Sequence, residues 1–200
     1  MSLVRFPHEK YASVELNQVA FPKTGMVVSQ MPLGSAFTEQ NPCENGMWVV
    51  ADKAVGTINA PSATIAAPIG VVYTTEKEYN DIRTWGLKMF GRKIAGDYPR
   101  VGLLDVGDTI TSNCFQYDDT ESGFAATAAS GDDPAKTAEE NMLATVAAFA
   151  TTPVYVAPVT GSPIPKLTKS KPGSGLYAKV VKFYTMPNGE KGIKYQIVNR

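Results

Sequence analysis

The sequence predicts a mainly β fold, a small β-barrel or sandwich-like domain with an extended N-terminal arm and one inserted α-helix. Its 17 glycines and 14 prolines punctuate the 200 residues at intervals typical of short strands and turns. A hydrophobic content of 44% is enough for one sizeable core, and nothing in the pattern marks a second one. We therefore expect an arm at residues 1–42, followed by a single β-rich domain at residues 43–200.

The predicted arm is extended rather than helical. Val14 and Leu16 alternate with polar neighbours and the alternation resumes at Val19, while prolines exclude a continuous helix. It carries more aromatic side chains than disordered tails usually do, namely Phe6, Tyr11, Phe21 and Phe37. Such a segment needs a surface, either the sheet edge of its own domain or a neighbouring subunit. We expect that deleting residues 1–42 leaves a folded domain but weakens assembly.

Strand-like runs follow the arm at short intervals. They lie at residues 47–51, 55–58, 69–74, 87–90, 100–104 and 109–115. Short strands at this spacing favour a meander or barrel over an alternating helix and strand layout. Thr75 and Glu78 have the spacing of a capping box, which predicts one or two helical turns over residues 76–82.

One longer helix is expected near residues 134–150. Asp132 or Asp133 is placed to cap it, and Pro134 suits its first turn. A single apolar stripe is spaced for one face of this helix, and its members are Ala138, Met142, Val146 and Phe149 or Ala150. The stripe predicts that the helix packs against the sheet, and Pro153 is expected to end it.

Two structures are predicted for the last part of the chain. Prolines at positions 158, 163, 165 and 172 predict an ordered or semi-rigid connector. Residues 176–199 predict a β-hairpin, in which Pro187 and Asn188 suit a type I turn and Gly189 takes the left-handed conformation that closes it. The hairpin is a candidate contact surface because it carries Lys179, Lys182, Lys191 and Lys194.

The residues do not assemble into a recognisable catalytic, cofactor-binding or metal-binding motif, and we expect a protein that is not an enzyme. His8 is the only histidine and lies in the predicted arm, so histidine-dependent nucleophiles and histidine-rich metal sites lack a residue in the core. Cys43 and Cys114 belong to no paired motif, which predicts two buried, reduced thiols. Phosphate-binding glycine patterns and the nucleophile elbow do not occur in the sequence.

Acidic residues gather at two predicted turns. Asp105 and Asp108 flank a glycine, and a second group follows in the next loop, at Asp118, Asp119 and Glu121. Paired acids are typical of glycosidases and acidic clusters can bind cations, although the spacing does not match a calcium-binding loop. We interpret these residues as solvated turn carboxylates.

The formal net charge is zero, but the charges are unevenly distributed. Residues 105–140 hold nine acidic side chains against Lys136 alone, and residues 166–200 hold eight basic ones against Glu190 alone. The two segments can pair within one molecule, between identical neighbours, or with a third partner. No aromatic-interleaved basic stripe suggests nucleic acid. The uncharged stretch around Leu143 to Val159 is interrupted by Thr and by Pro153 and Pro158, so the sequence predicts no membrane span.

Two stretches of this sequence resemble structural proteins of tailed bacteriophages, most closely the small β-rich proteins that decorate or cement the capsid. The first is Asp97-Tyr98-Pro99-Arg100-Val101-Gly102-Leu103-Leu104-Asp105-Val106-Gly107-Asp108-Thr109. The second is Gly175-Leu176-Tyr177-Ala178-Lys179-Val180-Val181-Lys182-Phe183-Tyr184-Thr185, with its Pro-Asn-Gly turn and Ile193-Lys194-Tyr195-Gln196. The resemblance covers about half of the chain, mainly beyond residue 97.

The resemblance implies a structural virion protein, made in the cytoplasm of a host bacterium, that stabilises the capsid by binding the major capsid protein shell. It also implies a homo-oligomer, commonly a trimer, on the capsid surface. One alternative is another virion component, such as a head fibre base or tail protein. The other is a carbohydrate-binding or hydrolytic module that uses Trp48, Trp85 and tyrosines together with Asp118 and Asp119.

Overall fold

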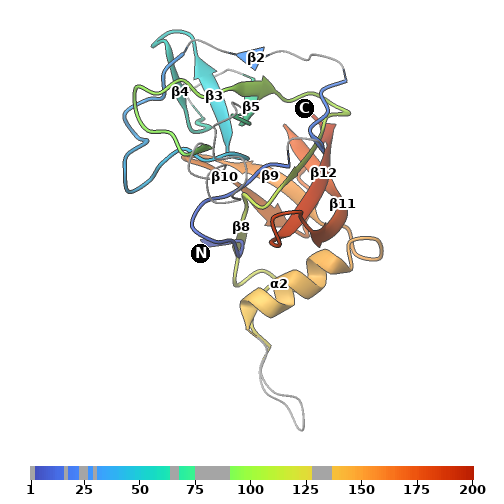
Figure 1. Ribbon diagram of the computed structural model, residues 1–200. Helices are drawn as coiled ribbons and strands as arrows, with labels where there is room; N and C mark the ends of the chain where they lie inside the picture. Colours follow the sequence, from blue (N-terminus) through green and yellow to red (C-terminus); the bar gives the residue numbers. More distant parts are fainter. Residues whose placement is uncertain are drawn as a thin grey trace.

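The computed structural model describes residues 3–15, 18–22, 27–28, 31–63, 68–74, 91–127 and 137–200. These residues form two β-sheets and the helix α2 (Figure 1). The smaller sheet lies above the larger one in Figure 1, and α2 lies below both. The mainly β, sandwich-like fold predicted from the sequence is therefore confirmed.

The larger sheet has seven strands in the order β1-β8-β10-β9-β11-β12-β7. Their bounds are β1 Leu3–Arg5, β7 Thr109–Ser112, β8 Gln116–Asp118, β9 Tyr155–Val159, β10 Ser162–Thr168, β11 Tyr177–Thr185 and β12 Lys191–Asn199. Neighbouring strands are antiparallel, except that β8 and β10 are parallel.

This sheet curls like a barrel wall, because its two ends are linked by a very short connection. In a flat sheet, the five spacings from β7 across to β8 would measure roughly 24 Å. Only residues 113–115 join the end of β7 to the start of β8, and the four Cα–Cα steps of this link reach at most about 15 Å. The sheet must therefore curve, and the enclosed side holds most of the core.

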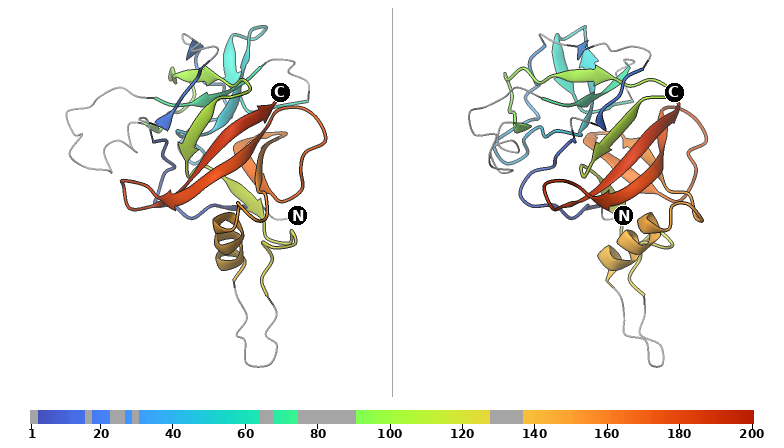
Figure 2. Two further views of the ribbon diagram at one scale, coloured as in Figure 1. Left: turned by 90° about the vertical axis from the view of Figure 1, so that its right-hand side faces the viewer. Right: turned by 45° about the vertical axis from the view of Figure 1, so that its right-hand side comes forward.

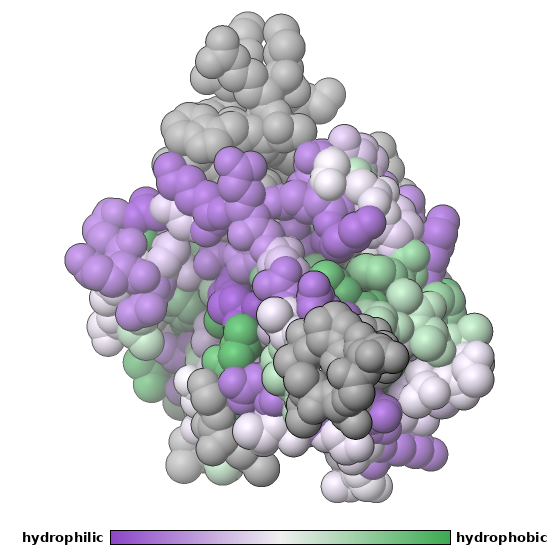
Figure 3. Space-filling view, turned by 90° about the horizontal axis from the view of Figure 1, so that it is seen from below, coloured by the Kyte–Doolittle hydropathy of each residue, from purple (hydrophilic) through white to green (hydrophobic). Residues whose placement is uncertain are grey.

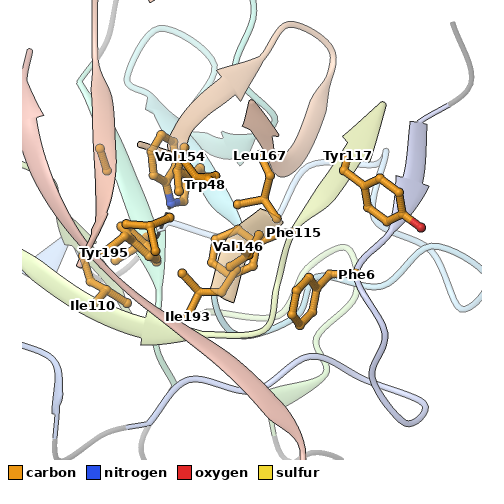
Figure 4. Packing of buried hydrophobic residues seen from close by; sticks show 14 of the residues in the cluster. Phe6, Trp48, Ile110, Phe115, Tyr117, Val146, Val154, Leu167, Ile193 and Tyr195 are labelled. Atoms are coloured by element: carbon orange, nitrogen blue, oxygen red, sulfur yellow. Dashed lines mark hydrogen bonds between the residues drawn. The ribbon is translucent and has the colours of Figure 1, made fainter. Parts of the chain in front are cut away.

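The smaller sheet has five strands in the order β2-β6-β5-β3-β4. Their bounds are β2 Val27–Val28, β3 Trp48–Asp52, β4 Thr57–Asn59, β5 Ile69–Val72 and β6 Val101–Leu103. Both faces of β3 are buried, since Trp48 belongs to the main core while Val49 packs with Leu33 and Phe37. Trp48 Nε1 donates to the Tyr195 hydroxyl at 3.1 Å, which joins the two sheets (Figure 4).

Five of the six predicted strand runs correspond to strands β3 to β7, although β7 stops at Ser112, where the chain turns into β8. The run at 87–90 and the helical turns at 76–82 lie outside the described residues, as does Leu16.

The predicted helix is present but begins later than expected. Helix α2 spans Ala138–Ala147, and its N-cap is Thr137 rather than Asp132 or Asp133, which lie outside the described residues. Thr137 and Glu140 form a reciprocal capping box that satisfies backbone N–H groups at the helix start. The predicted stripe is confirmed, because Met142 and Val146 are fully buried. From below, hydrophilic residues cover much of this face, and hydrophobic residues appear between them on both sides (Figure 3).

The predicted proline-rich connector is wrong, because residues 155–168 form the hairpin β9–β10. Gly161, with φ of 80°, supplies the left-handed residue of the turn. Pro163 and Pro165 fall where the β9–β10 register shifts, and pairing with β8 begins only at Lys166. Prolines are tolerated at such irregularities because no ladder hydrogen bond is required of their missing N–H.

The predicted C-terminal hairpin is confirmed. Gly189 N–H donates to the Met186 carbonyl at 2.9 Å, and Met186 N–H donates to the Glu190 carbonyl at 2.7 Å. Gly189 has φ of 86°, the conformation that the sequence requires of it. The turn therefore sets the register of β11 against β12.

The N-terminal segment lies along its own domain, which is the first of the two surfaces considered for it. β1 pairs with β8, and Phe6 is 1% exposed and packs edge-on against Phe115. Farther along, Val14 and Ala20 form bridges to β7. Its apolar side chains complete the core, so residue 42 does not mark a boundary in the packing.

Candidate functional site

The two stretches that resemble phage proteins meet at residues 107–109 and 196–197, although β6, the strand within the first stretch, belongs to the smaller sheet. Thr109, at the end of the first, is the ladder partner of Gln196, at the end of the second. The Gln196 side-chain amide also donates to the Gly107 carbonyl at 3.3 Å. The strands β7, β11 and β12 therefore form one continuous unit, although β7 and β11 are far apart in the sequence.

The side of this unit that faces away from the core is the candidate site. Buried residues alternate with exposed ones along β12, and Tyr195 and Ile197 point to the core. We define the outer hairpin face by its six solvent-facing residues, Lys179, Val181, Lys182, Lys194, Gln196 and Val198. In the left-hand view of Figure 2, the hairpin crosses the front of the molecule, and no described element lies over it.

The three lysines of the outer hairpin face make no ion pair with the described residues. Lys182 and Lys194 are direct ladder partners, and the Lys182 ammonium lies 4.6 Å from the centre of the Tyr184 ring. The nearby carboxylate of Glu15 instead accepts hydrogen bonds from the Tyr184 hydroxyl and the Gln18 amide. The face is therefore positively charged.

Other basic residues of the C-terminal segment pair with the acidic middle of the chain. Lys166 Nζ lies 3.6 Å from Asp118 and 3.4 Å from Glu121, and Arg200 lies 3.8 Å from Asp105. Some of the predicted pairing between the acidic and the basic segment therefore occurs within one molecule. The hairpin lysines take no part in it, and the ammonium of Lys191 instead donates to the Thr185 hydroxyl.

His8 lies in a polar cluster that anchors the N-terminal segment. Its Nδ1 is 2.6 Å from the Phe6 carbonyl and its Nε2 is 3.0 Å from Arg5 Nη2, which fits a neutral ring that donates from Nδ1. Glu44 accepts from Arg5 at 3.0 Å and from the Ala12 N–H at 2.6 Å. Burial lowers the pKa of His8, and Arg5 lowers it further, against the opposing effects of the Phe6 carbonyl, Glu44 and Glu190.

A cavity of about 490 Å³ adjoins this cluster. It lies between the N-terminal segment, residues 36–47 and the start of β10. Arg5 and Glu44 reach it, and apolar side chains such as Phe37, Met47 and Ile164 line the rest. The charges of Arg5 and Glu44 neutralise each other, so the cavity presents no unbalanced charge for a ligand.

The interpretation of the acidic residues as solvated turn carboxylates is wrong for Asp108 and Asp118, which are buried and whose carboxylates serve local structure. The Asp108 carboxylate accepts from the Asp105 N–H, and Asp118 accepts twice from Thr120. These Thr120 hydrogen bonds lower the pKa of Asp118, and Lys166 lowers it further. A glycosidase acid needs a raised pKa, so the environment of Asp118 opposes that role.

Burial removes other candidates from solvent. Trp48 is fully buried, and Trp85 lies outside the described residues. Cys43 and Cys114 are buried free thiols, and burial raises the pKa of both, that of Cys114 to about 12. Within the described ranges, no group of three or more His, Cys, Asp or Glu side chains is placed to hold a metal ion. No helix in the described part of the chain has the length and apolarity needed to cross a bilayer.

Sequence reasoning identified the lysines of the outer hairpin face but missed its valines and the Arg5–Glu44 pair. The valines are exposed because the pairing of β11 with β12 shifts beside them. The sequence of one strand does not show where its pairing with another strand shifts. Arg5 and Glu44 are 39 positions apart and meet only through the fold.

Comparisons with known proteins add no identification, since no family model, curated protein or solved structure matches this chain significantly. The fold class and the outer hairpin face therefore define the protein as a mainly β protein with a basic exposed sheet face.

Proposed function

We propose that this protein is a structural component of a tailed bacteriophage particle, which binds the major capsid protein shell and stabilises it. The observation that carries the proposal is the contact between the two phage-like stretches, where Thr109 at the end of the first pairs with Gln196 of the second. Stretches that resemble one family and also meet in the fold support a shared origin better than separate matches do. The role is non-enzymatic, and the protein acts on the capsid surface as a homo-oligomer, with a trimer favoured by the resemblance.

The structure offers a surface suited to this role. The outer hairpin face is exposed and basic, and its residues lie on the paired strands β11 and β12, which hold it in place for contact with another protein. By contrast, the aromatic platform required by a carbohydrate-binding module does not include Trp48, which is buried. The exposed basic face therefore suits a contact with a capsid protein better than it suits a carbohydrate site.

The proposal is tested with capsids from a virus genome in which the coding sequence of this chain has been deleted. Purified protein is added, and capsids are separated from free protein by sedimentation. We expect co-sedimentation and increased resistance of the shell to heat. If no protein associates with the shell, the proposal is wrong. Particle imaging with labelled protein distinguishes the shell from a head fibre base or a tail, the alternative positions.

A further inference from the structure

The outer hairpin face contains two irregularities that expose apolar side chains. The pairing of β11 with β12 shifts between Tyr177 and Ala178, and again between Val180 and Lys182. Val198 is the extra residue at the first shift, and Val181 is the extra residue at the second. Each shift is a β-bulge, a feature that commonly re-aims a side chain or ends strand pairing.

Both bulged residues are valines that project into solvent. Val181 is 39% exposed and Val198 is 37% exposed, whereas neighbouring Val180 and Ile197 are 1% exposed. The bulges therefore place exposed apolar area beside the lysines.

The lysines of the face also lack a compensating charge among the described residues. Like charges placed directly opposite each other in a β-ladder are destabilising, yet Lys182 and Lys194 occupy such positions. Elsewhere in the larger sheet, Lys166 is balanced by Asp118 and Glu121. A partner that brings carboxylates would relieve the repulsion between Lys182 and Lys194.

We infer that the outer hairpin face binds a protein surface on which carboxylates surround apolar side chains. This inference rests on the proposed function, under which that surface belongs to the major capsid protein. Interfaces of this kind combine an apolar centre with a charged rim that sets orientation and association rate. Here Val181 and Val198 supply apolar area, and Lys179, Lys182 and Lys194 supply the complementary charge.

A protein partner fits these residues better than nucleic acid does. Single-stranded nucleic acid is held by aromatic side chains with free faces, and the Tyr184 ring is already covered by Lys182. The face holds no arginine, and its two valines would lie against phosphates without any favourable contact. A protein surface with carboxylates around apolar groups matches both the lysines and the valines of the face.

The test compares two charge-reversal variants in the capsid co-sedimentation assay. K182E/K194E reverses the charge of the face while keeping like charges opposite each other, so the folding penalty of the pair is retained. K53E/K171E is the matched control, because it makes the same change in net charge at two exposed lysines outside the strands. We expect K182E/K194E to weaken capsid binding at least about tenfold and the control to change it less than about twofold.

Two further variants separate charge from apolar contact and protect the test against misfolding. K182Q/K194Q removes the charges without reversing them, and V181T/V198T keeps β-branched shape while adding hydroxyl groups. Both should weaken binding by about threefold or more, and the salt dependence of binding should decrease only in K182Q/K194Q. Circular dichroism of each variant shows whether it is folded before binding is compared.

The outcomes separate the inference from the proposed function. If wild type binds the shell and folded K182Q/K194Q and K182E/K194E bind equally well, the inference is wrong and the proposed function stands. If wild type does not bind the shell, the proposed function is wrong, and so is the assignment of a capsid partner to this face. Tighter binding of wild type to DNA than to capsids, lost in K182E/K194E, would also overturn the inference.

Discussion

The N-terminal segment and the C-terminal hairpin pack on opposite sides of the same strand, β7, yet they differ in what they leave exposed. Backbone groups of Glu15 and Ala20 bond to β7 from one side, and β12 pairs with it from the other. The N-terminal segment buries Phe6 and Val14 in the core, whereas the hairpin keeps one face in water. The difference indicates that the N-terminal segment completes the fold, while the hairpin presents a surface.

The largest effect is expected from deleting residues 1–42. The extended pattern of this segment led us to expect a removable arm, but its packing predicts the opposite outcome. Deletion removes Phe6, Val14, Leu33 and Phe37 from the core and leaves β7 with an open edge. The truncated chain should show no cooperative unfolding transition in urea. A cooperative transition would show instead that residues 43–200 fold without the segment.

A single substitution in the same region should also cost much stability. Phe6 is 1% exposed and its ring packs edge-on against Phe115 at a centroid distance of 5.9 Å. Phe6→Ala should reduce the free energy of unfolding by about 3–5 kcal/mol, since a large cavity is created. Leu3→Ala, at a residue 39% exposed, is the control and should have a much smaller effect. Similar losses in both variants would mean that Phe6 is not part of the core.

The hairpin also contributes to stability through its buried face, and Tyr195→Phe tests this contribution. Tyr195 is fully buried, and its hydroxyl accepts the Trp48 Nε1 hydrogen bond between the two sheets. Removing the hydroxyl leaves the indole N–H buried without this partner, so the free energy of unfolding should fall by about 1–3 kcal/mol. Urea denaturation monitored by Trp fluorescence measures this loss. An unchanged midpoint would show that the N–H finds another acceptor.

How far the sequence predicts these regions depends on how local their determinants are. The C-terminal hairpin was predictable because Pro187, Asn188 and Gly189 encode its turn within three residues. The β9–β10 hairpin was missed because Pro163 and Pro165 suggest a connector, and only pairing with β8 and β9 shows where their missing N–H groups are tolerated. Tertiary context outweighed a local signal there.

The candidate site was predictable in the same limited sense. The lysines of the outer hairpin face are visible in the sequence, and their alternation with apolar residues suggests which side is exposed. The bulges at Val181 and Val198 depend on the register between two strands, so no pattern within one strand reveals them. The destination of the N-terminal segment was also left open, because its partner strands lie about 100 residues away.

The N-terminal segment, unlike the hairpin, contains a histidine, His8, and the pH dependence of stability tests its role. The pKa of His8 is lowered in the folded state, chiefly by burial and then by Arg5, so folding favours the neutral ring. The unfolded chain then binds more protons, and stability contributed by neutral His8 is present above pH 6.5 and lost as the pH falls below it. Between pH 7 and pH 5, wild type should lose more stability than His8→Gln. Parallel pH profiles for the two proteins would contradict this assignment.

The smallest effect on stability is expected on the outer hairpin face itself. Replacing Lys182 and Lys194 by alanine removes two directly opposed charges, on an exposed and a half-buried residue. The free energy of unfolding should therefore change by no more than about 0.5 kcal/mol, and a small gain is the expected direction. Urea denaturation at low and high salt measures the change, and salt should reduce any gain because it screens the repulsion. A loss above about 1 kcal/mol would mean that the lysine stems pack against Tyr184 or neighbouring strands as structural elements. With stability unchanged, any loss of capsid binding by variants at these positions would reflect the contact surface, whereas variants at Phe6 would lose binding only through unfolding.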